Sequence, residues 1–393
     1  MDRTLIEAFG RRVRIGMVGG GSDSVIGRTH LIAMRADGLC ELTAGALSID
    51  PKIAIASGRQ ELLAPDRIYT NWREMLERES VRPDRIDAVV IATPPRLHDP
   101  VARAFLERGF DVICEKPLTH DLAEARNLVS AVKASGRLFC LCHCYTGYPM
   151  VRQARALVAE HAIGKVRMIE GEFSIGTAGV AFEPDDLSER HWRFRPDQEG
   201  KAGILGEAGS HVYHMACYVT GLHAESVSAT MATYAARREV YDNAYMTVRF
   251  NEGVQGRMWY SYVAAGNDHG LTLKIYGETG SITWWQEEGE ILWLKPMGKP
   301  AIRYARGYQG MADDAELATR IREGHPEGYL MAFANLYQLF AQSIMARNLG
   351  RPHAQFSASL PNVDDGLRGM AFIEAATQSH EQGGVWVNCD ATS

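Results

Sequence analysis

The sequence lacks the marks of several protein classes. Its 393 residues include no apolar run of membrane-spanning length, and the segment Met1 to Glu7 lacks the apolar core of a secretory signal peptide. It has no block of lysine and arginine, and its net charge of −6 argues against general affinity for nucleic acid. We therefore expect a cytoplasmic protein that acts on a small molecule, with neither a membrane nor a nucleic acid as partner.

Metal-binding cysteine patterns are also missing. None of the seven cysteines lies in a Cys-x-x-Cys spacing. Cys140, Cys142 and Cys144 alternate beside His143, in a stretch that we predict to be a strand. Alternate residues on one strand face lie ~6.6 Å apart, too far for a shared zinc ion whose Zn–S bonds are ~2.3 Å long. We interpret these cysteines as buried, reduced thiols and predict no metal site.

The composition is that of a globular protein with more than one core. Hydrophobic residues make up 46% of the chain and charged residues 23%, which is typical of globular domains. A chain of 393 residues exceeds the size at which a single core keeps growing, so we expect two domains.

The first predicted strand, Val13–Val18, runs into a glycine-rich segment, and helical character follows over Arg28–Arg35. This order of strand, glycine-rich turn and helix places a pyrophosphate at a helix N-terminus. Gly19 and Gly21 fit the G-x-G-x-x-G pattern, but two or three additional residues precede Gly27, so an ordinary strand-to-helix turn remains an alternative. The residues that we expect to contact a dinucleotide here are Gly19, Gly21, Ser22 and Ile26.

The second predicted strand, residues 41–48, bears on the choice of cofactor. An acidic residue at the end of this strand binds the adenosine ribose and favours NAD, whereas a nearby cation accepts the 2′-phosphate of NADP. Ser48 occupies the strand end, Asp50 follows it, and Lys52 and Arg59 lie close behind. We predict Ser48 and Asp50 as cofactor contacts and leave the choice between NAD and NADP open.

Three further strands alternate with helices. We predict strands over 87–92, 112–114 and 140–144, with helices over 97–108 and 122–134 between them. Gly109 follows the first helix, and Asp121 with Glu124 resembles a capping box at the start of the second. Strands that alternate with helices are typical of a parallel sheet covered by helices on both faces.

The strand 112–114 ends in Glu115-Lys116-Pro117. A glutamate and a lysine at the end of a buried strand are costly unless they pair or meet a ligand. In doubly wound sheets, ligands bind at the carboxyl ends of the strands, and Pro117 prevents the strand from continuing past Lys116. These three residues alone are also compatible with a surface turn, and the surrounding motifs favour the ligand site.

Together, these motifs resemble the Gfo/Idh/MocA family of oxidoreductases. The resemblance covers nearly the whole chain and rests on Gly19-Gly20-Gly21 with Ile26-Gly27 and His30, on Thr93-Pro94 with His98, and on Glu115-Lys116-Pro117. It implies an α/β protein with an N-terminal Rossmann dinucleotide-binding domain (1–146) and a substrate-binding and oligomerisation α/β domain (147–393) with a large open, mainly antiparallel sheet. Members of the family mostly oxidise or reduce a carbinol carbon of sugars, cyclitols or related polyols. Cofactor contacts are then expected at Thr93, Pro94, His98, Glu115 and Lys116.

The second half of the sequence agrees with this division. Pro149 opens a predicted helix over 151–160, after which hydrophobic residues alternate as they do in strands. We predict strands over 166–173, 227–235, 244–250, 255–261, 271–276, 281–285 and 385–388, and long helices over 329–345 and 365–380. Many strands without helices between them indicate an antiparallel sheet.

The predicted sheet is rich in large aromatic residues, namely Trp259, Tyr260, Trp284, Trp285 and Trp293. A solvated sheet face carries less aromatic surface than this, so we predict a homo-oligomer, a dimer or tetramer, in which a second subunit covers one face. Packing of the same residues within one chain is an equal alternative.

A predicted helix in the second domain carries the candidate catalytic residues. Glu207, His211 and His214 lie at positions i, i+4 and i+7, on one helical face. A carboxylate one turn from an imidazole can fix its tautomer and raise its basicity, as general-base catalysis requires. The family resembled has a catalytic histidine at the position of His211 and aspartate at that of Glu207, so Glu207 orients His211 or binds a substrate hydroxyl directly. A zinc site and a structural histidine pair are the alternatives, and no third strong zinc ligand is indicated.

Other polar residues are candidates for the substrate pocket. Trp192 and Arg193 resemble a Trp-Arg or Trp-Lys pair that faces the active site in relatives, and Cys144 stands where one branch of the family usually has asparagine. Further candidates for contacts with sugar hydroxyls are Tyr148, Asp242, Asn243 and His325. For each of them a polar loop residue in water is the alternative.

The expected function is that of an NAD(P)-dependent dehydrogenase or reductase acting on a sugar, glycoside or cyclitol. In this hypothesis His211 takes the proton of a substrate hydroxyl while the hydride moves to the nicotinamide, and Lys116 stabilises the developing alkoxide. Two alternatives stay open: an enzyme that recycles tightly bound NAD(H) in an oxidation–elimination or internal redox reaction on a glycoside, and a non-enzymatic regulator that senses dinucleotides. Lys116 and His211 count against the regulator, because a sensor needs no acid–base pair.

Overall fold

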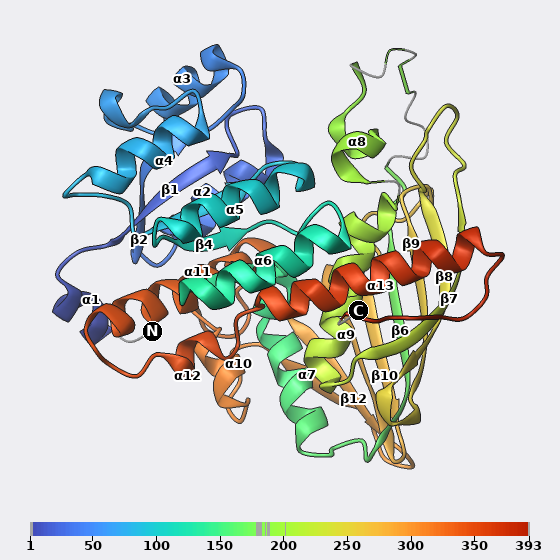
Figure 1. The fold of residues 1–393 in the computed structure, drawn as a ribbon. Coiled ribbons are helices and arrows are strands. Elements are labelled where there is room, and N and C mark those ends of the chain that lie inside the picture. The colour runs from blue at the N-terminus through green and yellow to red at the C-terminus, as the bar shows by residue number, and fades with distance from the viewer. Residues whose placement is uncertain (1–2, 178–182, 185, 187–188, 201, 392–393) are drawn as a thin grey trace. The chain divides into compact units, whose positions relative to one another are not determined.

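A computed structural model describes residues 3–177, 183–184, 186, 189–200 and 202–391 (Figure 1). The chain forms two compact units. Unit 1 comprises Met1–Thr119, Ala123–Cys144 and Tyr329–Gly366, and unit 2 comprises His120–Leu122, Tyr145–Gly328 and Leu367–Ser393. Within the described residues, no helix combines the length and the apolar character that a bilayer crossing demands.

Unit 1 is built on a five-stranded parallel sheet in the order β2-β1-β3-β4-β5. The strands are β1 (Val13–Gly19), β2 (Cys40–Ala46), β3 (Ala88–Ala92), β4 (Asp111–Cys114) and β5 (Phe139–Leu141). All residues of β3 and β4 are buried, as expected for strands that helices cover on both faces. The predicted doubly wound Rossmann arrangement is confirmed.

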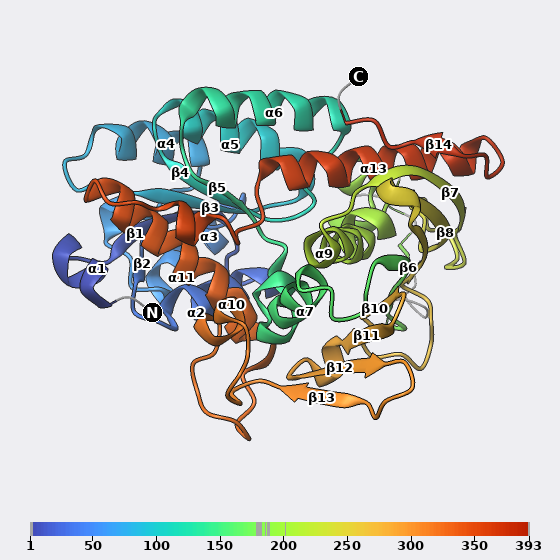
Figure 2. The same cartoon turned by 90° about the horizontal axis from the view of Figure 1, so that it is seen from below.

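Helices cover both faces of this sheet, α4, α5 and α6 lying along one face and α2 and α11 along the other (Figure 2). Their starts follow local signals, because the side chains of Ser24, Asp50 and Asn71 accept backbone N–H groups in the first turns of α2, α3 and α4. The helices of unit 1 are α1 (Arg3–Phe9), α2 (Val25–Arg35), α3 (Pro51–Gln60), α4 (Trp72–Val81), α5 (His98–Glu107), α6 (Leu122–Ser135), α11 (Gly328–Asn348) and α12 (Ala354–Ser357).

The single division expected at residue 146 differs from the compact units, because α11 belongs to unit 1. The hydroxyl of Tyr337 lies 2.7 Å from Nδ1 of His30, and the ring of Phe333 packs edge-on against the same imidazole. Arg347 at the end of α11 binds the carboxylate of Asp111 at the start of β4. These contacts join segments that are more than 200 residues apart, and helical periodicity alone does not reveal them.

The predicted strand 140–144 is shorter than expected. β5 ends at Leu141, and a 3-10 turn begins at Cys144 (Cys144–Gly147). The prediction that Cys142 and Cys144 lie in a strand is therefore wrong. Both thiols are buried all the same, which satisfies the apolar pattern without a strand.

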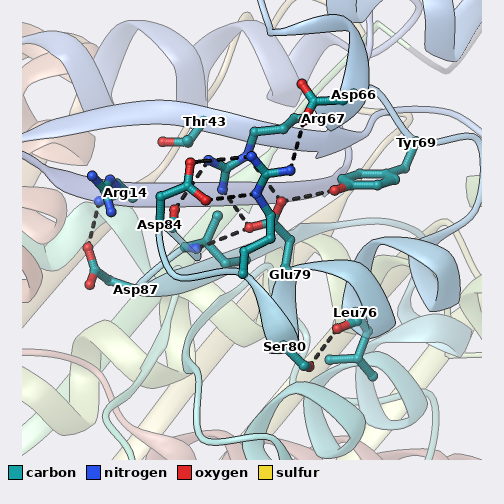
Figure 3. A network of polar contacts seen from close by, with 12 residues as sticks. Arg14, Thr43, Asp66, Arg67, Tyr69, Leu76, Glu79, Ser80, Asp84 and Asp87 are labelled. Carbon is teal, nitrogen blue, oxygen red and sulfur yellow. Dashed lines mark hydrogen bonds and ion pairs between the residues drawn. The ribbon is translucent and has the colours of Figure 1, made fainter.

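A buried ion pair braces the crossover between β2 and β3 (Figure 3). The guanidinium of Arg67 binds the carboxylate of Glu79 in α4 at 2.5 Å, and neither side chain is more than 5% exposed. Glu79 also accepts the hydroxyl of Tyr69 and the backbone N–H of Ile86, and Arg67 reaches Asp84 at 3.2 Å. Because these groups satisfy one another, the charges are tolerated inside the unit.

Unit 2 contains a nine-stranded sheet in the order β13-β12-β11-β10-β6-β9-β8-β7-β14. All neighbouring strands are antiparallel except β6 and β9, which are parallel, so the predicted mainly antiparallel sheet is confirmed. The strands β12 and β13 were not predicted. The strands are β6 (Val166–Ser174), β7 (Ala224–Ala232), β8 (Asn243–Phe250), β9 (Gln255–Ser261), β10 (Thr272–Gly277), β11 (Gly280–Trp285), β12 (Ile291–Pro296), β13 (Ile302–Ala305) and β14 (Val387–Asn388).

One face of this sheet is covered by α7 and α9 (Figure 2). On that side Tyr260 packs against Gly209, and Trp284 packs against the ring of Tyr148. Tyr260 and Trp284 are buried, whereas the other three aromatic residues of the set, Trp259, Trp285 and Trp293, are partly exposed. Two of the five aromatics thus belong to the core of the chain. The helices of unit 2 are α7 (Pro149–Ala159), α8 (Pro196–Glu199), α9 (Ser210–Thr220), α10 (Asp313–Leu317) and the greater part of α13 (Val363–Glu381).

Candidate active site

A cavity of about 780 Å³ lies beside the glycine-rich loop of unit 1. Gly21 and Ser22, two of the residues predicted to contact a dinucleotide, line it, together with the start of α2, Leu47 after β2, and Ser57 in α3. Helix α2 begins at Val25, so the positive end of its dipole lies at the loop. Gly19, Ile26, Ser48 and Asp50 do not line this cavity.

The steric demands of the loop fit a dinucleotide. Gly19 and Gly20 have φ of +77° and +73°, which strain any residue with a Cβ. A Cβ on Gly27 would lie 2.0 Å from the carbonyl oxygen of Gly20, so the loop and α2 approach one another as closely as two backbones can. The extra residues before Gly27 therefore lengthen the loop without removing the close approach that the G-x-G-x-x-G pattern serves.

The segment after β2 holds the residues on which the choice between NAD and NADP depends. Asp50 caps α3, its Oδ1 accepting the N–H groups of Lys52 and Ile53, and Ser48 Oγ accepts the N–H of Asp50. An anionic carboxylate is thus fixed two residues beyond Ser48, while Lys52 is exposed.

The Glu-Lys-Pro segment follows β4 as predicted, and a chain of hydrogen bonds holds it. Oε1 of Glu115 lies 3.0 Å from Nε2 of His30, whose Nδ1 lies 2.7 Å from the hydroxyl of Tyr337. Oε2 of Glu115 accepts the backbone N–H of Lys116 at 3.2 Å, and the Lys116–Pro117 peptide is cis. His30 and Glu115 are buried and Lys116 is half-buried. Glu115 therefore positions the backbone of Lys116, which follows the carboxyl end of β4.

A second histidine connects two strand-end loops. His98 Nδ1 lies 2.8 Å from the carbonyl oxygen of Pro117, and its Nε2 lies 2.9 Å from that of Thr93. Burial lowers the pKa of His98, and the two carbonyl contacts oppose this shift. His98 thus links the loop after β3 to the loop after β4. Both loops were predicted to contact the cofactor.

The ligand atoms of His30, Glu115 and Cys142 lie within 4.8 Å of one another, as in metal sites. Both ring nitrogens of His30 already have hydrogen-bond partners, one of them Glu115 itself. Burial raises the pKa of the Cys142 thiol well above its usual value, and the charge of Glu115 adds to the shift. Hydrogen bonding among buried side chains therefore explains why His30 and Glu115 lie close together, and Cys142 is a buried thiol beside them.

In unit 2, the local structure around Glu207 differs from the prediction. Leu205–Gly209 forms a π-helical turn, and α9 begins only at Ser210. The predicted helix is present, but Glu207 lies in its π-helical turn, so regular α-helical geometry does not relate Glu207 to His211. Oε1 of Glu207 lies 3.0 Å from Nε of Arg193, so the carboxylate forms an ion pair with a residue of the predicted Trp-Arg pair. The charge of Glu207 raises the pKa of Arg193 above its usual value. π-Turns inside helices frequently mark functional sites.

His211 lies in the first turn of α9, 7% exposed, among aromatic side chains. The ring of Tyr145 packs edge-on against it with a centroid distance of 4.8 Å, and the ring of Phe173 lies at 6.4 Å. The hydroxyl of Tyr145 is 3.0 Å from Nε2 of His269. Sequence reasoning did not select His269, because nothing local marks a loop histidine 58 positions after His211.

The remaining predicted pocket residues take different positions. Tyr148 is buried beside Trp284, and Gln286 donates to its hydroxyl. Asp242 is fully buried and accepts from the N–H groups of Tyr234 and Ala235 and from Arg238. The side-chain oxygen of Asn243 accepts the indole N–H of Trp259. Trp192 begins a 3-10 turn beside Arg193. His325 is exposed. Asp242 thus has a structural task, the closure of the turn between β7 and β8.

Comparison with known proteins agrees with this fold. Residues 13–143 match the family described as "Oxidoreductase family, NAD-binding Rossmann fold", and residues 151–283 match the GFO/IDH/MocA C-terminal domain. An uncharacterized oxidoreductase of Bacillus subtilis, YfiI, is 31% identical over 95% of this chain and 96% of its own length. The chain belongs to the Gfo/Idh/MocA family of oxidoreductases.

Two further relatives of this Gfo/Idh/MocA protein carry more specific names. An inositol dehydrogenase homolog from Azotobacter vinelandii, solved with NAD⁺, superposes with a TM-score of 0.91 at 34% identity and covers 96% of this chain and 97% of its own. The same homolog has also been solved with NADH and myo-inositol. Levoglucosan dehydrogenase of Pseudarthrobacter phenanthrenivorans is 28% identical over 69% of this chain and 73% of its own length. The chain is therefore an NAD-binding oxidoreductase, and the loop of unit 1 fits that cofactor.

Proposed function

We propose that this protein is an NAD-dependent dehydrogenase that oxidises a secondary alcohol of a cyclitol, sugar or glycoside. The observation that carries the proposal is the dinucleotide loop of unit 1, and each unit also contains one side chain suited to alcohol chemistry, Lys116 in unit 1 and His211 in unit 2. Its relatives named above act on or bind polyols of this class, which supports the choice of substrate. Bound NAD supplies the hydride acceptor.

His211 is the proposed general base. Its imidazole removes the proton of the reacting hydroxyl, and the aromatic rings around it exclude water and limit its rotation. Lys116 is proposed to stabilise the negative charge that develops on the alkoxide. Glu207 holds Arg193 by an ion pair, and we assign it the task of fixing Arg193 for contact with a substrate hydroxyl.

We propose NAD rather than NADP as the cofactor. The carboxylate of Asp50, fixed at the N-terminus of α3, would repel a 2′-phosphate, while a free ribose hydroxyl could hydrogen-bond to it. Equilibrium binding of NADH and NADPH, followed by the reduced-nicotinamide fluorescence, tests this choice without any substrate. Equal affinities would contradict it.

A homo-oligomer through the outer face of the unit 2 sheet is also proposed. That face carries a shallow hollow of about 360 Å³, and Tyr245, 54% exposed, stacks on Trp259 within it. Acidic Glu170 and basic Lys274 line the same hollow, so a second copy related by a two-fold axis would meet complementary charges. Light scattering after chromatography should give a dimer or tetramer, and Tyr245→Glu should shift it toward the monomer.

The experiment that tests the enzymatic proposal is a panel of polyols, sugars and glycosides with NAD and with NADP, followed by the absorbance of the reduced nicotinamide. Turnover of a cyclitol or sugar with stoichiometric formation of NADH is expected. An enzyme that recycles a bound cofactor would instead convert a glycoside without net NADH, and a sensor would bind NADH and convert nothing.

A further inference from the structure

We propose that His269 is a positioning residue for the general base, acting on His211 through Tyr145. This inference rests on the proposed function, in which His211 takes the proton of the substrate hydroxyl. All three residues belong to unit 2, and three separate segments of the chain contribute them.

The contacts form a continuous path. Nε2 of His269 shares a hydrogen bond of 3.0 Å with the hydroxyl of Tyr145, and the Tyr145 ring meets the His211 ring at 83°. Tyr145 and His211 are 5% and 7% exposed, so neither ring has solvent into which it can swing. Phe173 lies against the rings of both His269 and Tyr145, at centroid distances of 4.5 and 6.1 Å.

The backbone of His269 is itself anchored at two points. The N–H groups of His269 and Gly270 both donate to Oε1 of Glu287. Gly270, with φ of +61°, lies so close to Ser174 that a Cβ would be 2.6 Å from its carbonyl oxygen. The loop is thereby tied to the end of β6, directly after Phe173. His269 is a rigid support, in contrast to a flexible loop residue.

A neutral His269 suits this task. Burial lowers the pKa of its imidazole, with the charge of Glu287 opposing the shift, so the ring keeps a lone pair that can accept the Tyr145 hydroxyl at neutral pH. Held in this way, the phenol ring keeps its position, and its packing limits the orientations of the His211 imidazole. A base fixed before the substrate arrives needs no reorientation in the transition state.

Two substitutions separate the hydrogen bond from the packing. Tyr145→Phe keeps the ring against His211 and removes the hydroxyl, whereas His269→Phe keeps an aromatic ring against Phe173 and removes the acceptor. Each should lower kcat roughly three- to tenfold, the worth of one hydrogen bond, and change KM less than about twofold. The double variant should be no slower than the slower single one, because both remove the same interaction.

A conservative variant and a matched control accompany them. His269→Gln places an amide oxygen near the position of Nε2, so kcat should recover most of the loss seen in His269→Phe. Tyr213→Phe also removes a buried tyrosine hydroxyl from unit 2, on the helix that carries His211, but this hydroxyl contacts the backbone of Ala224. It should leave kcat within about twofold of the native value.

The decisive measurement does not depend on turnover. In full-length protein labelled with ¹⁵N at its 13 histidines, His211→Gln identifies the ring signals of His211. Tyr145→Phe and His269→Phe should displace these signals in the same direction, while Tyr213→Phe leaves them in place. Unchanged His211 signals, or kcat losses that multiply in the double variant, would overturn the inference.

The outcome also separates this inference from the proposed function. If His211→Ala turned over substrate at the native rate while Tyr145→Phe still moved the ring signals, the role of base would be wrong and the positioning contact would stand. If His211→Ala were inactive and neither Tyr145→Phe nor His269→Phe altered the signals or kcat, only the positioning role would fail. Circular dichroism of each variant confirms that it is folded.

Discussion

The two units hold their candidate catalytic side chains in different ways. In unit 1, the backbone of Lys116 is fixed by polar contacts that run from Glu115 to His30 and Tyr337. In unit 2, His211 packs against the rings of Tyr145 and Phe173. For the proposed role of Lys116, the position of its positive charge matters most. For the proposed role of His211, the orientation of its imidazole ring matters most.

This difference decides how each site tolerates change. Removing one member of a buried polar chain leaves another group without its partner, which costs stability as well as position. Removing one polar atom from an aromatic cage leaves most of the packing in place. We therefore expect substitutions around Lys116 to affect folding and turnover together, and those around His211 to affect turnover first.

The largest expected effect is that of His211→Ala. Loss of the general base should lower kcat by about 10²- to 10⁴-fold, because the substrate hydroxyl must then lose its proton to water. Steady-state turnover with the best polyol of the panel measures this, and NADH affinity should stay within twofold of the native value. His223→Ala, an exposed histidine of the same unit, is the control. A native rate of turnover in His211→Ala would show that His211 is not the general base.

Lys116→Met should come next, with kcat lowered by about 10²- to 10³-fold through loss of the positive charge beside the alkoxide. The methionine keeps most of the apolar stem, so folding should be retained. Lys133→Met is the matched control, since Lys133 is 63% exposed and pairs with Asp364 at the surface of the same unit. Stopped-flow measurement of the first turnover shows whether the chemical step has slowed. An unchanged first-turnover rate would exclude Lys116 from the reaction.

The polar bracing of unit 1 is tested by Arg67→Met. This change removes the ion-pair partner of the buried Glu79 carboxylate. It should lower the free energy of unfolding by about 3–5 kcal/mol. Urea unfolding measures the loss. The exposed pair formed by Arg78 and Glu74 on the same helix provides the comparison, and Arg78→Met should cost less than about 1 kcal/mol. Equal losses would mean that burial does not distinguish the two pairs.

The smallest effect concerns pH. Because the pKa of His98 is lowered in the folded protein, the unfolded chain binds a proton more readily as the pH falls below ~6.5. Stability should therefore decrease below that pH, by at most about 1.4 kcal/mol per pH unit from this one group. Urea midpoints between pH 7.5 and 5.5 should show a shallower decline in His98→Gln than in the native protein. His353→Gln, which changes an exposed histidine of unit 1, should not alter the slope.

Much of the fold could be predicted from local patterns. The strand before the glycine-rich loop, the termination of β4 before Lys116 and the start of α7 at Pro149 all follow from signals within a few neighbouring residues. The misplaced features are those that depend on distant contacts. The π-turn at Glu207 has no signature in helical spacing, and the end of β5 at Leu141 is set by the chain that packs beside it, where Pro361 accepts its N–H.

The sequence by itself determined the alternation of strands and helices in unit 1, the glycine loop and the segment that carries Lys116, because turns, caps and hydrophobic periods act over short distances along the chain. The tertiary structure alone decided that Tyr337 supports Glu115 through His30 and that Glu207 binds Arg193. It also decided that Tyr145 packs against His211 and hydrogen-bonds to His269. Such contacts form only when the packing of a core brings together side chains that lie far apart in sequence. Local sequence patterns therefore do not reveal them.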